Sequence, residues 1–491
     1  MAKTEFLLLA LLWSAISSAQ SRPLEGKWRG AADAAETHVN FAFEFKRDKH
    51  QAMTADFYQD NLGYYAVGLG EVKDGGQGHF TIPGAGLKLH LVGSSLTVTG
   101  LLDVPAAAVE FAATESLPSL SSLPELPTGP GPTWQLRLGG AIYAPAARRD
   151  GFAYLGNIDG VFYAIKVADG TVAWTFAAGR PIYGEALTTA AAVYFVCDNG
   201  YLYKISRTTG KALWRYDLGD GRVPRIPPSA RVFDYDRQSP RPLLIEGNIY
   251  VGAGDGGFHA VRADNGTRLW RVAVKGKIRT TAVAHGPNII FTTAEGADHG
   301  AVVAVARNTG KRVWTYDAAA PVTTAPSIAG DVLIAGTRGA NTRLIGLDAR
   351  SGAVRWSQYY WGSWVESEAV VTDGSAYIGS GDLFTVTNFD PLTGHTFWRT
   401  DVYGWVLARP AVTQDSVYAG VASAHRNFQF EFRQLSSLTK LDRHTGKIIW
   451  RWPMTEWPGA FLNGFIAAPS VAADLVLIGG VNGSLYAFPA D

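Results

Sequence analysis

The stretch Thr208-Thr-Gly-Lys-Ala-Leu-Trp214 decides the fold, because its glycine four residues before a tryptophan recurs along the chain. The pattern is found at Gly170/Trp174, Gly210/Trp214, Gly266/Trp270, Gly310/Trp314, Gly352/Trp356, Gly394/Trp398 and Gly446/Trp450. Successive tryptophans of this series lie 40 to 56 residues apart, and short alternating segments such as Tyr203–Ser206 come before them. A period of roughly 40 to 45 residues built from strands predicts a β-propeller with one four-stranded sheet per repeat.

The glycine and the tryptophan of the pattern have separate structural roles. The glycine suits a tight turn between two strands, where a positive φ is often required. The tryptophan should point from the outermost strand toward the neighbouring blade, where burial removes roughly 150–250 Å² from water. We interpret the series as structural docking residues rather than ligand contacts. Its members are Trp134, Trp174, Trp214, Trp270, Trp314, Trp356, Trp398 and Trp450.

Trp134 belongs to this series because the last repeat is incomplete. Residues Asn482–Phe488 resemble the strand before the turn, but no docking tryptophan follows them. Trp134, within Thr133–Gly140, lies 40 residues before Trp174 and is in step with the repeats. We therefore expect an N-terminal strand to complete the final sheet, which closes eight blades over residues 132–491 and leaves short, protected edges.

The first 19 residues have the features of a secretory signal peptide. Lys3 is followed by an apolar run over 6–13 and by a small-residue cleavage site at 17–19. The run is short for a membrane span, and no cysteine follows the cleavage site for lipid attachment. We expect a soluble periplasmic or secreted protein with no transmembrane segment in the mature chain; an uncleaved anchor is the alternative.

Composition narrows the function classes. The 491 residues carry a net charge of +1, which argues against a nucleic-acid partner. The single cysteine, Cys197, excludes an internal disulfide, and its place in a strand pattern predicts a small buried apolar residue.

Residues 22–116 lack the repeat and predict a separate small β domain. Period-two alternation over 38–45, 53–57 and 87–91 indicates about six or seven antiparallel strands in a barrel or sandwich. The opening Gly26-Lys-Trp28 resembles the start of lipocalin-like barrels. The interior either holds a ligand or, as we favour at this size, is filled by Phe and Leu side chains. Residues 117–131 are a proline-rich linker, stiff and extended.

Six charged residues share a phase near the predicted inner strands of the propeller. These strands align on the small or proline residues Ala186, Pro242, Ala282, Pro326, Ala369, Pro410 and Pro469. One or three places before these anchors stand Glu185, Arg241, Arg279, Glu366, Glu368 and Arg409. We predict that they lie near the central channel, where they either orient a polar ligand or pair with one another at a water-filled mouth.

Long connections and extra aromatic residues should gather on one face of the propeller. The connections 217–240, 422–437 and 453–464 all join strand ends that emerge on the same side. Aromatic residues outside the docking series on these and neighbouring connections include Trp361, Trp364, Trp405 and Trp457. With Arg and Glu beside them, they suit a carbohydrate, an aromatic ligand or a protein partner. The alternative is that they cap the blade ends.

Motifs of catalysis and metal binding are absent from the sequence. No phosphate-binding loop, zinc-type histidine spacing or nucleophile elbow is present. Glu366 and Glu368 could serve acid–base chemistry, but carboxylates two apart on a strand are common in channel walls. We therefore predict no catalytic residue and no metal site.

The repeats Asp198–Trp214 and Gly254–Trp270 closely resemble PQQ-like (pyrroloquinoline-quinone-like) propeller repeats over about residues 132–491. One branch of that family contains quinoprotein alcohol dehydrogenases, which use PQQ with calcium and carry an adjacent cysteine pair. The other contains BamB-type proteins, non-enzymatic eight-bladed scaffolds of outer-membrane barrel assembly. The single cysteine departs from the first branch, and the N-terminal β domain and unlipidated start depart from the second.

The leading hypothesis is an exported, non-enzymatic propeller scaffold. It would bind a protein or glycan through its aromatic long-loop face, in cell-envelope assembly and without a cofactor. The alternative is a PQQ- and calcium-dependent alcohol or sugar oxidoreductase with an atypical site.

Overall fold

The computed structural model describes residues 23–490 apart from 35–36, 60–63, 102–107, 118–124, 224, 226–237, 297, 339–341, 361–364, 382, 425–434, 456–461 and 473. The predicted signal peptide therefore lies outside the described residues. The chain divides into two compact units, residues 1–123 with 428–433 and residues 124–427 with 434–491.

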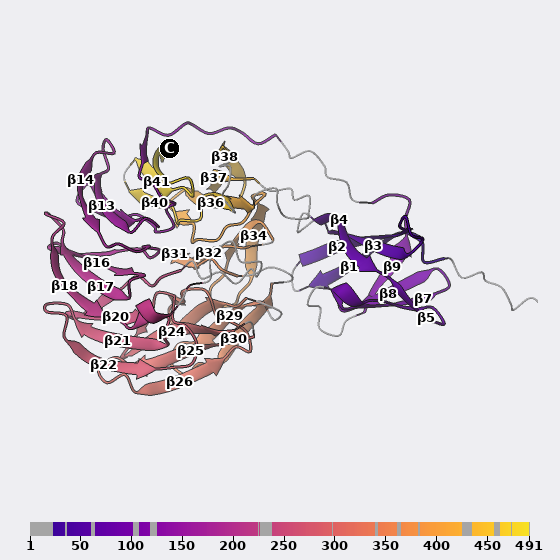
Figure 1. Ribbon diagram of the computed structural model, residues 1–491, viewed down its shortest axis with the longest axis horizontal. Coiled ribbons are helices and arrows are strands. Elements are labelled where there is room, and N and C mark those ends of the chain that lie inside the picture. The colour runs from indigo at the N-terminus through magenta and orange to yellow at the C-terminus, as the bar shows by residue number, and fades with distance from the viewer. Residues whose placement is uncertain are drawn as a thin grey trace, which may run out of the picture. The chain divides into compact units, whose positions relative to one another are not determined.

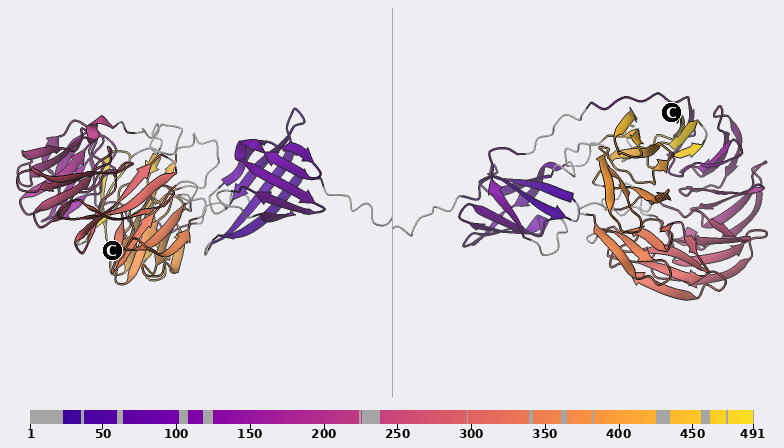
Figure 2. Two further views of the ribbon diagram at one scale, coloured as in Figure 1. Left: turned by 90° about the horizontal axis from the view of Figure 1, so that it is seen from below. Right: turned by 180° about the vertical axis from the view of Figure 1, so that it is seen from behind.

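The first unit is one antiparallel, nearly closed barrel-like sheet (Figure 2). Its strands run in the order β4 (Tyr64–Glu71), β3 (Met53–Gln59), β2 (Thr37–Arg47), β1 (Gly26–Ala34), β9 (Val109–Ala113), β8 (Ser95–Thr99), β7 (Leu87–Val92), β6 (His79–Ile82) and β5 (Lys73–Gly76), with the 3-10 turn η2 (Pro83–Ala85) after β6. The prediction of six or seven strands was wrong, because the described residues of this unit form nine strands in one sheet. β5 is exposed along its whole length and so lacks the apolar alternation that marks a strand in sequence.

Aromatic side chains of the first unit pack inside this sheet. Trp28, Phe41 and Phe43 are fully buried. The ring centroid of Phe43 lies 5.3 Å from that of Phe57 and 5.2 Å from that of Phe111. These rings are the core of the unit.

The second unit is the predicted eight-bladed propeller, whose sheets form a ring in Figure 1. Blade 1 consists of β11 (Ala147–Arg149), β12 (Phe152–Gly156), β13 (Val161–Lys166) and β14 (Val172–Ala177), and blade 2 of β15 (Leu187–Thr188), β16 (Ala192–Cys197), β17 (Tyr201–Ser206) and β18 (Ala212–Asp217). Blade 3 consists of β19 (Leu243–Ile245), β20 (Asn248–Gly252), β21 (Gly257–Arg262) and β22 (Arg268–Ala273), and blade 4 of β23 (Val283–His285), β24 (Asn288–Glu295), β25 (His299–Ala306) and β26 (Arg312–Asp317). The 3-10 turn η3 (Asp220–Arg222) follows β18.

Blades 5 to 8 repeat this up-and-down order. Blade 5 consists of β27 (Ser327–Ala329), β28 (Val332–Gly336), β29 (Arg343–Asp348) and β30 (Val354–Tyr359), and blade 6 of β31 (Val370–Thr372), β32 (Ser375–Gly379), β33 (Thr385–Phe389) and β34 (Thr396–Asp401). Blade 7 consists of β35 (Ala411–Val412), β36 (Ser416–Ala424), β37 (Ser437–Asp442) and β38 (Ile448–Pro453), and β39 (Leu462–Gly464) also pairs with β36. Blade 8 consists of β40 (Ser470–Ala472), β41 (Leu475–Gly479), β42 (Ser484–Pro489) and β10 (Trp134–Arg137). The core lies between blades, as where Phe162 stacks on Phe195 at 4.3 Å.

The ring closes through β10, as predicted from the position of Trp134. β10 pairs antiparallel with β42, and Trp134 lies opposite Ala487. The adjoining chain also joins the propeller, since Thr128 forms a parallel bridge with Arg451 of β38. The amide of Gly129 donates to the carbonyl of Arg451 at 2.8 Å. Two separate parts of the segment before blade 1 thus hold blades 7 and 8.

Each docking tryptophan covers a glycine that follows it around the ring, a contact that we name the blade joint. The glycines Gly170, Gly210, Gly266, Gly310, Gly352, Gly394 and Gly446 have φ between +68° and +80°. A Cβ on any of them would lie within 3.0 Å of the indole of the preceding blade. At the eighth joint Gly129 lies against Trp450 in the same way. The absence of a side chain therefore lets neighbouring blades approach.

Indole hydrogen bonds complete most joints. The Nε1 atoms of Trp134, Trp174, Trp270, Trp356 and Trp398 donate at 2.9–3.1 Å to the carbonyl oxygen three residues before the covered glycine. Trp214 shares its proton between the carbonyl oxygens of Ala263 and Asp264. Nε1 of Trp314 has no acceptor among the described residues. The joints are therefore alike in packing and differ in polar contacts.

Candidate functional site

A pocket lies where the innermost strands of all eight blades begin. Residues three places before each inner-strand anchor form a first ring: Tyr143, Tyr183, Ser239, Arg279, Thr323, Glu366, Leu407 and Ile466. Residues one place before the anchor form a second ring: Pro145, Glu185, Arg241, Thr281, Ala325, Glu368, Arg409 and Ala468. Fourteen of these sixteen residues, all but Thr323 and Arg241, line a hollow of about 690 Å³, open solvent included, which we name the channel pocket.

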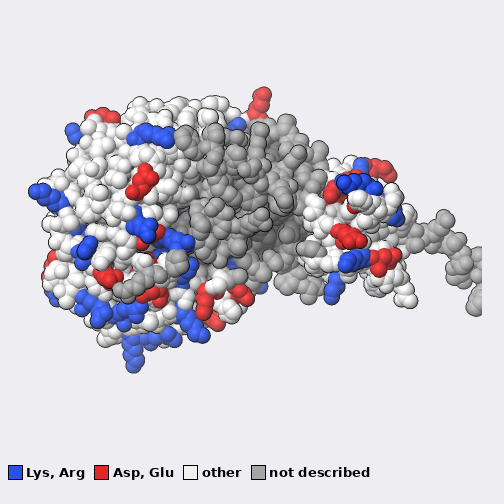
Figure 3. All heavy atoms as spheres, viewed as in Figure 1, with Lys and Arg blue, Asp and Glu red and all other residues white. Residues whose placement is uncertain are grey.

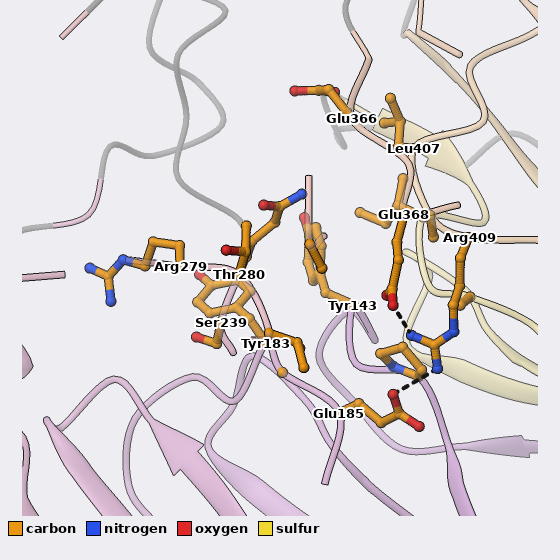
Figure 4. Close-up of a pocket in the computed structure, with 18 residues that line it drawn as sticks. Tyr143, Tyr183, Glu185, Ser239, Arg279, Thr280, Glu366, Glu368, Leu407 and Arg409 are labelled. Atoms are coloured by element: carbon orange, nitrogen blue, oxygen red, sulfur yellow. Dashed lines mark hydrogen bonds and ion pairs between the residues drawn. The ribbon is translucent and has the colours of Figure 1, made fainter. Parts of the chain in front are cut away.

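Ion pairs join the charged residues of the second ring (Figure 4). Arg409 of blade 7 contacts Glu185 of blade 2 at 2.7 Å and Glu368 of blade 6 at 3.3 Å. Arg241 of blade 3 reaches the same Glu185 at 3.4 Å. Burial alone would lower the pKa of Arg409, but the two carboxylates outweigh burial and raise it. Arg409 therefore remains a cation that ties distant blades together across the channel.

The charged residues of the first ring have partners outside the rings. Arg279 forms a buried ion pair with Asp220 of η3, whose other oxygen accepts the amide proton of Gly254 at 2.9 Å. In Figure 4 the guanidinium of Arg279 points away from Arg409 and its two glutamates. Glu366 pairs with Arg338 at 3.5 Å. Four of the six predicted charges, Glu185, Arg241, Glu368 and Arg409, thus pair with one another near the channel. The other two, Arg279 and Glu366, pair with residues outside the rings.

Arg225 supports the aromatic side of the pocket, a role that the sequence did not indicate. It pairs with Asp198 at 2.5 Å, and its guanidinium carbon lies 4.6 Å from the ring centroid of Tyr183. Tyr183 meets Tyr143 edge to face, with centroids 5.5 Å apart. Burial raises the pKa of Asp198, although Arg225 acts in the opposite direction.

The aromatic residues proposed from sequence have different outcomes. Trp405 is half-buried against the apolar cluster of Leu407 and Ile466, and its backbone pairs with Ala422, so it does not line the channel pocket. Trp361, Trp364 and Trp457 lie outside the described residues. The pocket-lining tyrosines, Tyr143 and Tyr183, were missed; their phase with Glu366 and Arg279 was the signal that could have found them.

The described residues do not fit PQQ with calcium. Cys197 is buried on β16, donates to the carbonyl of Arg180 at 3.2 Å and has a pKa that burial raises to about 11. A group of three or more His, Cys, Asp or Glu side chains able to hold a metal ion does not occur in the described part of the chain. The guanidiniums that line the pocket are already bound to carboxylates. An anionic quinone would have to displace one of them.

Lys and Arg side chains are interspersed with Asp and Glu on the propeller face seen in Figure 3. Within the described ranges no helix has the length and apolar character needed to cross a membrane.

Comparison with known proteins places the propeller in a family. The sequence profile described as "Outer membrane protein assembly factor BamB" matches residues 127–239, 198–360 and 340–491. The chain is 22% identical to BamB of Shewanella oneidensis over 333 residues, 68% of this chain and 67% of that protein. It is 29% identical to BamB of Burkholderia pseudomallei over 199 residues, 39% of this chain and 46% of that protein.

Solved structures show the same fold at low identity. The quinohemoprotein alcohol dehydrogenase from Comamonas testosteroni superposes with a TM-score of 0.55 at 13% identity, over 73% of this chain and 76% of that one. The computationally designed protein Ika8 superposes with a TM-score of 0.54 at 14% identity, over 72% of this chain and 98% of that one. These likenesses concern the fold alone. The profile, in contrast, matches well over half of the chain, which therefore belongs to the family of the outer membrane protein assembly factor BamB.

Proposed function

We propose that the protein is a non-enzymatic scaffold of the cell envelope that binds a protein partner during outer-membrane protein assembly. The observation that carries this proposal is the match of the BamB profile along the whole propeller, 127–491. The arginines of the channel pocket are paired with carboxylates, and the described residues do not fit PQQ with calcium. Both points support a binding role over oxidation chemistry. The export signal predicted over 1–19 would deliver the chain to that compartment.

The long-loop face is the proposed contact surface. Antiparallel order places the connections that enter the inner strands, and those between the second and third strands, on the same side of every blade. The channel pocket opens among the first set of these connections. Loops held by a rigid ring of sheets are well suited to partner recognition.

In-cell photo-crosslinking tests the proposal. A crosslinking amino acid at Ser239, a partly exposed residue on the loop face, should capture a component of the outer-membrane assembly machinery. The same group at Thr309, in the turn before β26 on the opposite face, is the matched control and should capture none. Deletion of the gene should lower the amount of outer-membrane barrel proteins.

The opposite outcomes are equally clear. Equal capture from both faces, or unchanged levels of barrel proteins, would contradict the scaffold. Saturable PQQ binding in the presence of calcium, with dye-linked alcohol oxidation, would favour the oxidoreductase instead.

A further inference from the structure

We infer that the channel pocket binds a lysine or arginine side chain of the partner polypeptide. This inference rests on the proposed function and adds to it the chemistry of the group that enters the propeller. Two features of the described residues support it. The first ring is divided into an apolar and a polar half, and the arginines that line the pocket are already paired with carboxylates.

The first ring is divided by blade. Blades 7, 8, 1 and 2 contribute its apolar and aromatic half, namely Leu407, Ile466, Tyr143 and Tyr183. Blades 3 to 6 contribute its polar half, namely Ser239, Arg279, Thr323 and Glu366. A long basic side chain matches this division, because its methylene stem packs on apolar surface while its charged head seeks polar partners.

The charges favour a cation over an anion. Glu185, Glu366 and Glu368 line the pocket together with Arg279 and Arg409. Both arginines are held by carboxylates, Arg279 by Asp220 and Arg409 by two glutamates. An incoming anion would have to break one of these ion pairs and leave a carboxylate unpaired in a partly buried site, which is costly. An incoming cation can instead share a carboxylate that keeps its arginine partner.

Glu368 is the acceptor best placed to receive the cation. Its side chain is 26% exposed, and it shares Arg409 with Glu185 at the longer distance of 3.3 Å. An ionised carboxylate has about four lone-pair sites, so one shared guanidinium leaves acceptor capacity. Figure 4 shows Glu368 paired with Arg409, and the apolar residues Tyr143 and Leu407 line the same pocket, so a stem and a head group would both find partners there.

Peptide binding to the full-length protein tests the inference. The probe is dye-labelled acetyl-Leu-Arg-Leu-amide, followed by fluorescence anisotropy, with Leu-Glu-Leu and Leu-norleucine-Leu peptides as matched anionic and neutral probes. The arginine peptide should bind about tenfold tighter than either, and more weakly as salt is raised. Glu368→Gln should weaken it about fivefold or more. Glu246→Gln, in an exposed ion pair with Arg307 outside the pocket, should leave it unchanged.

Other results would overturn the inference. They are equal binding of the anionic or neutral peptide, binding that does not respond to salt, or unchanged affinity in Glu368→Gln. The salt response needs no variant, so a Glu368→Gln chain that failed to fold would not block the test. Displacement by free cadaverine as effective as by the peptide would replace the polypeptide with a small diamine. Loop-face crosslinks that persist alongside a negative peptide result would overturn this inference and leave the scaffold intact.

Discussion

His259 is a buried residue whose environment opposes its protonation. It is buried on β21, and its Nδ1 lies 3.0 Å from the hydroxyl of Tyr216. Burial, reinforced by the positive charge of Arg271, lowers the pKa of His259 to about 4. The native state therefore keeps this imidazole neutral at pH values where an unfolded chain already protonates it.

The pH dependence of unfolding follows from that difference. The contribution of His259 is complete above its unfolded pKa of roughly 6.5 and is lost as the pH falls toward 4. His259→Gln should remove about 3 kcal/mol of the acid-induced loss, since one pKa unit corresponds to about 1.4 kcal/mol. Urea unfolding at several pH values checks this, with the exposed His444→Gln as control. Parallel pH profiles for wild type and His259→Gln would refute it.

Arg409 offers a second test, of the ion pairs in the channel. Arg409→Met would leave Glu185 and Glu368 without their shared partner inside the channel. We expect a loss of about 2 to 3 kcal/mol in the free energy of unfolding, less than for a fully buried pair because water screens the site. Arg350→Met, which breaks an exposed pair with Asp331, should cost under about 1 kcal/mol. Equal urea midpoints for the two variants would contradict the structural role of Arg409.

Sequence phase located the channel charges but not the partners of Arg279 and Glu366. Glu185, Arg241, Glu368 and Arg409 share a position relative to a small or proline anchor, and that regularity was enough to place them at the channel. Asp220 and Arg338 stand on connections of irregular length, where no period relates sequence position to direction. Such long-range pairs become visible only when the ring is closed.

The blade joint between neighbouring sheets leads to a prediction about two glycines. Gly310 and Gly330 both have positive φ, so an alanine costs about 1 kcal/mol of backbone strain at either position. A Cβ on Gly310 would lie 2.7 Å from the indole of Trp270, whereas one on Gly330 meets nothing within 4 Å. Gly310→Ala should therefore be less stable than Gly330→Ala by a further 1 to 3 kcal/mol, roughly the cost of overpacking. Thermal melts that show equal losses would mean that the joint tolerates the extra methyl group.

The elements that the sequence revealed are those with a repeated residue. The outer strands are recognised in the sequence by the glycine and tryptophan, and the inner strands by their small or proline anchor residues. β39 carries neither signal and pairs with β36 across a long connection, so only the folded register exposes it. β5 was missed for the same reason, because an exposed strand has no apolar period.

For the whole molecule, closure of the ring is the feature to test. A fragment beginning at residue 124 keeps β10, Trp134 and Gly129, while one beginning at residue 139 lacks all three. The longer fragment should unfold cooperatively. The shorter one should lose roughly 4 kcal/mol, from the uncovered β42 edge and the buried indole area. Tryptophan fluorescence in urea measures both, and identical midpoints would show that the ring does not depend on β10.

The overall architecture was predictable because one short pattern recurs and one copy is displaced to the beginning of the propeller. The identity of the binding partner, in contrast, cannot be predicted from the repeated pattern. Binding surfaces are built from connections whose lengths break the period, and the family match rather than the pattern points to outer-membrane assembly.

The uniformity of the blade joints has a consequence for how such rings evolve. Each joint takes its indole from one repeat and its glycine from the next, so a duplication or deletion that runs from one tryptophan to another always leaves compatible ends. Whole blades can thus be duplicated or deleted while every new blade joint still has an indole and a glycine. The exception is the blade joint between Trp450 and Gly129, because its glycine lies outside the repeats. A duplication or deletion that crosses this joint would not keep the pairing of indole and glycine.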